Sequence, residues 1–323
     1  MRRKRRGGVL VRAVEERGGE QDESMTMSEV ARRACEAGAS VVLNALNVNS
    51  ASTITCKGTS ADLVTETDTA SEQAIVSVLN ALCPTHAILG EESGVSVAAE
   101  GDEASSFDYL WVVDPLDGTT NFAHRYPSFG VSVALLKRGR VFASCVVEFC
   151  GGPGCWSQRV YVAGRGIGST MNGVPIRVSD THDVGDALLC TGFGYEHLER
   201  WEKNLELFKH FTDVSRGVRR LGAASVDLCL VALGVLDCYW ELDCKAWDWA
   251  AGALVVAEAG GAVTSFTGDE WKPFARAIVA SNGVATLHDA VIAQTKPAAA
   301  SLEASGVSVG LWHHPPGYPP EFL

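Results

Sequence analysis

The sequence predicts a mixed α/β protein in which an α+β domain is followed by an α/β domain. Two patterns indicate this arrangement. Residues 27–175 contain helical patterns and then successive antiparallel strands, whereas short strands alternate with amphipathic helices over residues 176–298. The length of 323 residues also suits two domains, because domains typically have about 100–200 residues each.

The two ends of the chain lack such patterns. Residues 1–26 are first basic and then acidic, without a hydrophobic period, and we expect a disordered extension there. An arginine-rich start is also typical of a transit peptide, although such peptides contain few acids and residues 15–23 contain five. Residues 299–323 are rich in alanine and serine and then in proline, which predicts a tail.

Two helices are expected at the start of the first domain. Apolar residues recur at helical spacing over residues 28–47. Thr69 and Glu72 have the spacing of a capping box, an apolar helical stripe follows them, and Pro84 ends that helix.

Strands follow in the first domain. Apolar runs predict strands at residues 109–113, 129–136 and 141–149. The dipeptide Asn172-Gly173 is typical of a tight hairpin turn, which we expect to join residues 161–162 to residues 176–178.

The second domain alternates between the two kinds of element. Helices are predicted at residues 201–212, 223–234, 248–259 and 284–295. Short strands are predicted near residues 187–191, 238–242, 262–266 and 277–280. Gly260-Gly261 ends the third of these helices.

The charge excludes most nucleic-acid binders. The formal net charge is −12, and six of the basic residues lie within residues 1–14, so the remainder is more acidic still. A protein that binds phosphate backbones usually carries a basic surface. No apolar stretch reaches the length of a transmembrane helix, so we expect neither nucleic-acid nor membrane binding.

The ten cysteines show no Cys-x-x-Cys spacing, which argues against a zinc site. Several lie within apolar runs and are expected to be reduced, buried thiols. Redox regulation through Cys145, Cys150 and Cys155 is the alternative.

The strongest local motif covers residues 111–121, where an apolar strand runs into two carboxylates. Asp114 and Asp117 are three positions apart, and Gly118 after them allows a ligand to approach the backbone closely. An acidic turn that caps a helix would have the same composition. An aspartyl-phosphate phosphatase would instead place its two aspartates two positions apart.

Three other segments also join an apolar element to acids. They are residues 88–93, which contain Glu91, residues 246–252, which contain Asp248, and residues 57–68, which contain Asp68. Each alone is equally compatible with a helix cap or a solvated surface strand.

Together, these segments predict a metal site. If Glu91, Asp114, Asp117 and Asp248 converge, their mutual repulsion makes burial costly unless a cation is bound. Ligands that are all oxygen favour Mg²⁺ over zinc. Two such ions could clamp a phosphoryl group during in-line displacement.

These motifs resemble those of the inositol monophosphatase family. The resemblance rests on the stretches at 114–121 and 247–252, supported by residues 62–65 and 90–93, and it covers residues 28–295. It implies a layered αβαβα sandwich of the inositol monophosphatase/fructose-1,6-bisphosphatase type, and usually a homodimer. Residues 192–197 and 211–220 are most similar to the plastid-type members, which implies a chloroplast location, with the cytoplasm as the alternative.

The resemblance implies a site with two or three Mg²⁺ ions. Glu91, Asp114 and the carbonyl of Leu116 would bind the first ion, and Asp114, Asp117 and Asp248 the second. A weaker third ion would depend on Glu91.

The resemblance also implies the catalytic residues. Thr119 would hydrogen-bond the attacking water, Asp68 or Glu91 would help to take its proton, and the amides of Gly118 and Thr119 would hold the phosphate.

Substrate hydroxyl groups would contact the segment Gly222-Ala223-Ala224 and Glu241, which lies 19 positions after Gly222 and seven before Asp248. Lys57 resembles the basic residue of a mobile loop near the third metal. Residues 242–247 carry additional charges close to the expected substrate, which leaves the identity of the polyol open.

The implied function is a Mg²⁺-dependent, lithium-sensitive phosphomonoesterase that hydrolyses inositol 1-phosphate or galactose 1-phosphate. Its partner would be a small phosphate monoester. The alternatives are a histidinol-phosphate phosphatase, a 3′-phosphoadenosine-nucleotide or fructose-bisphosphate phosphatase, and a catalytically silent scaffold.

Overall fold

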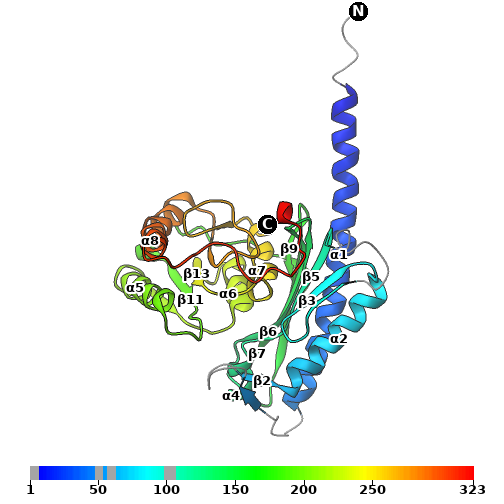
Figure 1. Ribbon diagram of the computed structural model, residues 1–323, viewed down its shortest axis with the longest axis horizontal. Helices are drawn as coiled ribbons and strands as arrows, with labels where there is room; N and C mark the ends of the chain where they lie inside the picture. Colours follow the sequence, from blue (N-terminus) through cyan, green and yellow to red (C-terminus); the bar gives the residue numbers. More distant parts are fainter. Residues whose placement is uncertain (1–6, 48–53, 57–62, 98–106) are drawn as a thin grey trace, which may run out of the picture.

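The computed structural model describes residues 7–47, 54–56, 63–97 and 107–323. Its elements form five layers (Figure 1). Helices α1 and α2 cover one face of an eight-stranded sheet, α6 and α7 lie between this sheet and a five-stranded one, and α5 and α8 cover the far side. The expected layered αβαβα sandwich is therefore confirmed.

The helices of these layers are α1 (Gly7–Asn47), α2 (Glu66–Leu82), α5 (Glu199–Val214), α6 (Ala224–Ala232), α7 (Ala246–Glu258) and α8 (Ala285–Ala304). A short helix, α4 (Thr119–His124), follows the fifth strand, and η1 (Val184–Asp186) and η2 (Pro320–Phe322) are single 3₁₀ turns. Among the described residues, no helix is both long and apolar enough to cross a membrane.

The eight-stranded sheet contains, in spatial order, β10 (Val174–Pro175), β9 (Gly168–Met171), β8 (Ser157–Gly164), β7 (Arg140–Cys150), β6 (Phe129–Lys137), β5 (Tyr109–Asp117), β3 (Ala87–Gly90) and β4 (Gly94–Ser96). The five-stranded sheet contains β12 (Gly217–Arg219), β11 (Leu188–Thr191), β13 (Cys238–Leu242), β15 (Ala277–Ser281) and β14 (Ala262–Thr264). A separate pair is formed by β1 (Ile54–Cys56) and β2 (Leu63–Thr65). The buried apolar residues form three cores. One lies between α1/α2 and the eight-stranded sheet, one surrounds α6 and α7 between the two sheets, and one lies between the five-stranded sheet and α5/α8.

Helix α1 corrects the prediction of a disordered extension for residues 7–26, and residues 1–6 lie outside the described residues. The helix begins at Gly7, and its carboxyl-terminal half packs on the sheet (Figure 1). The Glu23 carboxylate accepts hydrogen bonds from the Tyr109 hydroxyl at 2.5 Å and the Lys137 ammonium at 2.6 Å, and Ser24 is fully buried. Small and charged residues make these contacts, so the segment shows no hydrophobic period.

The carboxyl-terminal segment also differs from the predicted tail over residues 299–323. Helix α8 continues to Ala304. The chain then crosses between the two sheets, where Tyr318 is buried with its ring edge-on to Phe107 at 5.4 Å and to Phe274 at 5.1 Å. A few aromatic anchors fix this segment, although its composition is typical of a tail.

Two local predictions are wrong. Asn172-Gly173 joins β9 to β10 rather than residues 161–162 to residues 176–178, because β8 has already paired with β9. Thr69 and Glu72 do not form a capping box, since α2 begins at Glu66.

Candidate metal and phosphate site

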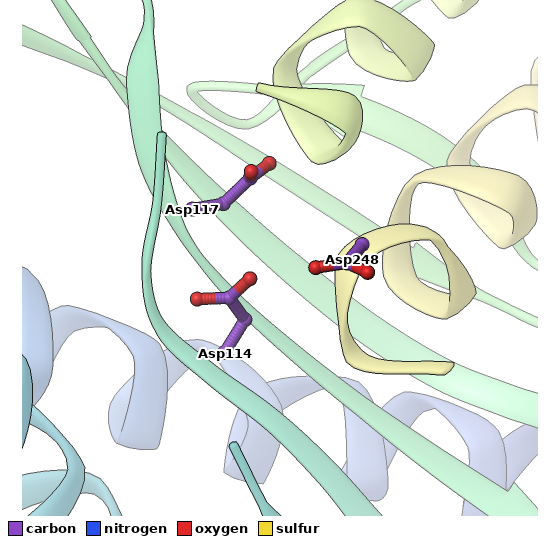
Figure 2. A group of neighbouring side chains, drawn as sticks. All are labelled: Asp114, Asp117 and Asp248. Atoms are coloured by element: carbon purple, nitrogen blue, oxygen red, sulfur yellow. The ribbon is translucent and has the colours of Figure 1, made fainter. Parts of the chain in front are cut away.

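Strand β5 presents two carboxylates on the same side of the sheet. A spacing of three would place Asp114 and Asp117 on opposite faces of a regular strand. Asp114 pairs with Ser132 and Asp117 with Gly130, so β5 contains one more residue than β6 over this interval. This bulge turns both carboxylates toward the first turn of α7 (Figure 2).

Asp248 in α7 completes the group. One oxygen from each of Asp114, Asp117 and Asp248 lies within 4.8 Å of the others. Figure 2 shows the three side chains converging from β5 and from the start of α7. The hydroxyl of Ser132 donates to the Trp247 carbonyl at 3.0 Å, which ties the start of α7 to the sheet.

Each aspartate is oriented by a hydrogen bond to one of its oxygens. Asp114 accepts the Leu116 amide at 3.0 Å, and Asp248 accepts the Lys245 amide at 2.5 Å. Asp117 accepts both the amide and the hydroxyl of Ser225, at 2.7 and 2.6 Å. These contacts hold the carboxylates in place through donor groups that are themselves neutral.

Glu91 lies beside this group. It follows β3, and its amide donates to the Val113 carbonyl at 3.1 Å. Burial raises the pKa of Asp114 well above its usual value, and the charge of Glu91 raises it further. The buried carboxylate of Glu72 accepts the amides of Glu92 and Ser93, both at 2.9 Å, and thereby holds the turn that contains Glu91.

The electrostatics of the group favour a cation. Asp114 is 1% exposed and Asp117 is 8% exposed. Burial raises the pKa of Asp117 to about 7, although the hydrogen bonds from Ser225 oppose this shift. Burial, followed by the charges of Asp117 and Glu91, raises the pKa of Asp248 to about 8. A divalent cation would relieve this repulsion, and the all-oxygen donor set suits a hard ion.

The predicted catalytic residues also meet at this site. The Thr119 hydroxyl lies 3.0 Å from the Asp68 carboxylate and 3.0 Å from the Leu116 carbonyl, and it can donate a hydrogen bond to either. Asp68 is buried in the first turn of α2. Gly118 has φ 84° and precedes α4, so the amides after it open a short helix.

The predicted substrate segment lies next to Gly118. A Cβ atom on Gly118 would be only 3.1 Å from the Cβ of Ala223. The Asn121 side chain donates to the Ser128 carbonyl at 2.6 Å and to the Leu221 carbonyl at 2.7 Å, which fixes the residues just before Gly222.

Glu241 is buried on β13 and accepts a hydrogen bond from the Tyr239 hydroxyl. Burial raises the pKa of Glu241 to about 7, and its charge raises the pKa of Asp117. Ala224 opens α6 beside Ser225. Lys57 lies outside the described residues.

Sequence reasoning missed Ser225 and Glu72. Ser225 directly follows the predicted Gly222–Ala224 segment, and this position in the sequence could have indicated that it belongs to the site. Glu72 has the pattern of a capping residue, and only the tertiary structure reveals that it binds the turn after β3.

Comparison with known proteins gives a consistent result. The Inositol monophosphatase family model matches residues 23–299. The chain is 54% identical over 290 residues to phosphatase IMPL1, chloroplastic, of Arabidopsis thaliana, covering 90% of this chain and 75% of that protein. It is 45% identical over 209 residues to the Nus factor SuhB of Pseudomonas aeruginosa, covering 64% and 73%.

A solved structure agrees with these relatives. The inositol monophosphatase from Anabaena superimposes with a TM-score of 0.70 and 34% sequence identity, covering 84% of this chain and 96% of that one.

Proposed function

This chain belongs to the inositol monophosphatase family, and from that premise we propose that it is a Mg²⁺-dependent phosphomonoesterase that hydrolyses inositol 1-phosphate. The observation that carries this proposal is the convergence of Asp114, Asp117 and Asp248 within 4.8 Å, next to the Thr119–Asp68 pair. Galactose 1-phosphate is a second substrate of the same chemical class.

The carboxylate group is proposed to hold Mg²⁺. Glu91, Asp114 and the Leu116 carbonyl would hold one ion, Asp114, Asp117 and Asp248 a second, and a weaker third would depend on Glu91. When bound, Mg²⁺ supplies Lewis acidity that stabilises phosphate charge and makes a coordinated water more acidic.

The residues around the carboxylates would orient the reactants. While the Thr119 hydroxyl donates its hydrogen bond to Asp68, the Thr119 oxygen can accept a hydrogen bond from the attacking water. Asp68 or Glu91 would then help to take the water's proton. The amides of Gly118 and Thr119, which precede Phe122, whose amide donates to the Gly118 carbonyl, would bind the phosphate oxygens.

The polyol would lie between two elements of the second domain. The segment Gly222-Ala223-Ala224 would contact its hydroxyl groups on one side, and Glu241 would accept hydrogen bonds from them on the other. The closeness of Ala223 to Gly118 supports this placement, because it puts the polyol next to the phosphate. Lys57, which is outside the described residues, is proposed to be the family's basic residue near the third metal.

Three further properties belong to the same proposal. We propose inhibition by lithium and a homodimer on the basis of the family. We propose a chloroplast location because a relative that is 54% identical is named chloroplastic.

Phosphate release from a substrate panel at millimolar Mg²⁺ tests the proposal. The panel contains inositol 1-phosphate, galactose 1-phosphate, histidinol phosphate and 3′-phosphoadenosine 5′-phosphate. We expect preference for the first two. Preference for either of the others would keep the mechanism and overturn the substrate. Release from none would favour a silent scaffold if Mg²⁺ also fails to bind in calorimetry, and an untested phosphate ester if Mg²⁺ binds.

A further inference from the structure

Asp243 lies between two proposed functional carboxylates and has an unusual backbone. Glu241 is the penultimate residue of β13, Asp248 lies in the first turn of α7, and Asp243 is in the turn that links the two elements. Its φ of 67° is in the left-handed region, which residues other than glycine, asparagine and aspartate seldom adopt. Ion pairs with residues distant in the sequence also hold this turn.

Two arginines hold the Asp243 side chain. One carboxylate oxygen accepts Arg200 Nε from α5 at 2.6 Å, and the other accepts Arg276 Nη1 at 3.1 Å. All three side chains are 18–22% exposed, so this ion-pair triad is more shielded from water than a surface pair. The Asp243 amide also donates to the Arg276 carbonyl at 2.8 Å.

The carboxyl-terminal segment covers this triad. The Arg276 guanidinium lies 4.0 Å from the ring centroid of Trp312, and the Arg276 amide donates to the Gly310 carbonyl at 3.1 Å. Arg200 Nη1 donates to the Ser308 carbonyl at 3.2 Å. The indole of Trp312 donates to the Cys244 carbonyl at 3.1 Å, directly after Asp243. Residues 308–312 thus bind both the turn and the arginines.

The two residues after Asp243 contact the functional carboxylates themselves. Burial raises the pKa of Glu241, and the neighbouring Cys244 thiol opposes this rise. The Lys245 amide donates to Asp248 at 2.5 Å. The Lys245 ammonium lies 5.2 Å from the Trp247 ring centroid. The two charged side chains of residues 242–247 thus have partners: Asp243 pairs with two arginines, and Lys245 lies over the Trp247 indole.

We propose that Asp243 is a positioning residue: held by Arg200, Arg276 and the carboxyl-terminal segment 308–312, it fixes the left-handed turn that sets Glu241 and Asp248 in their working orientation. This inference rests on the proposed function of those two carboxylates. It assigns a role at the site to the segment over residues 308–312.

Three variants distinguish the contribution of the left-handed backbone at Asp243 from the contribution of its ion pairs. Asp243→Ala removes both ion pairs and disfavours the left-handed turn. Asp243→Gly also removes the ion pairs, but glycine adopts this φ without strain. Trp312→Phe keeps the ring over Arg276 and removes only the hydrogen bond to Cys244. Asp186→Ala is the matched control, because it breaks the exposed Asp186–Arg216 pair of 2.7 Å in the same domain.

The measurements are Mg²⁺ affinity by calorimetry, the KM for inositol 1-phosphate and the unfolding temperature. Loss of an outer contact that orients a metal ligand typically weakens binding about 10–100-fold. We expect about 10-fold weaker Mg²⁺ binding and a raised KM for Asp243→Ala, smaller changes for Asp243→Gly and Trp312→Phe, and none for Asp186→Ala.

Wild-type Mg²⁺ affinity and KM in Asp243→Ala, with only the unfolding temperature lowered, would overturn the proposal. Should Asp243→Ala fail to fold, wild-type values in both Asp243→Gly and Trp312→Phe would overturn it equally. Wild-type protein that binds Mg²⁺ but releases no phosphate would refute the proposed function, and the comparison of metal affinities would still test Asp243.

Discussion

Thr119 and Asp68 are 51 positions apart and are joined by a hydrogen bond of 3.0 Å from the threonine hydroxyl to the aspartate carboxylate. The bond links the start of α4 to the first turn of α2, so it brings a hydroxyl group and a buried acceptor to the edge of the aspartate group. In the proposed mechanism this pair orients the attacking water.

Replacing Thr119 tests that role. Thr119→Val keeps the shape of the side chain and removes the hydroxyl, so we expect kcat to fall about 10²–10⁴-fold, the range for loss of a positioned proton-transfer group. Thr119→Ser keeps the hydroxyl and should retain most of the activity. Steady-state kinetics on inositol 1-phosphate measure both. Near-normal turnover in the valine variant would rule out the hydroxyl as a catalytic group.

Ser225 should control metal affinity through Asp117. Ser225→Ala removes the hydroxyl bond of 2.6 Å and leaves the amide bond, so we expect Mg²⁺ binding to weaken about 10-fold by calorimetry. Ser144→Ala is the control, because this buried hydroxyl has no hydrogen-bond partner among the described residues. Equal affinities in the two variants would show that the Ser225 hydroxyl does not orient the ligand.

Stability without metal should decrease as the pH rises. The pKa values of Asp117 and Asp248 are raised to about 7 and about 8 from an ordinary value of 3.8. At pH values between the ordinary and the raised pKa, the folded state therefore binds more protons than the unfolded state. The free energy of unfolding therefore falls from about pH 4 to about pH 8. Thermal unfolding should show this fall, and a larger stabilisation by Mg²⁺ at pH 8.5 than at pH 6. A metal-free unfolding temperature that rises over this range would contradict the assignment.

Gly118 should tolerate no side chain. Its φ is 84°, and a Cβ would lie 3.0 Å from the Ser128 carbonyl oxygen and 3.1 Å from the Ala223 Cβ. We expect Gly118→Ala to lower the free energy of unfolding by about 1–3 kcal/mol and to reduce activity strongly. Gly94→Ala has a similar φ of 71° without a neighbour within 4 Å, so it measures backbone strain alone. Equal effects in chemical denaturation and activity would mean that contact with Ala223 does not matter.

Most elements of the fold were predictable because they carry clear periodicity, whereas their layered arrangement was implied by the resemblance to the family. The helices over residues 199–214 and 246–258 and the strand at residues 238–242 lie within a few residues of their predicted ranges. The extension of α1 over residues 7–27 was not predictable, because no hydrophobic period marks it in the sequence. Three-residue strands such as β12 are too short to give a pattern.

The site was predictable where one motif supplies both residue type and order. Asp114, Asp117 and Asp248 are examples, and the structure places them together. The bulge that turns Asp117 toward Asp114 depends on pairing with β6, which no local pattern encodes. Glu72 and Asp243 were missed as supporting residues, since their partners are distant in the sequence.

The most direct test of the central claim is the turnover of Asp117→Asn on inositol 1-phosphate across a Mg²⁺ titration. The substitution keeps the size of the side chain and its capacity to accept from Ser225, but it removes the charge that the proposed metal site needs. We predict a loss of turnover of at least 100-fold together with weakened Mg²⁺ binding, as for removal of a catalytic electrostatic group. Normal turnover of the variant at the Mg²⁺ concentration that supports wild-type turnover would show that one carboxylate of the group is dispensable. The metal-dependent mechanism would then be wrong.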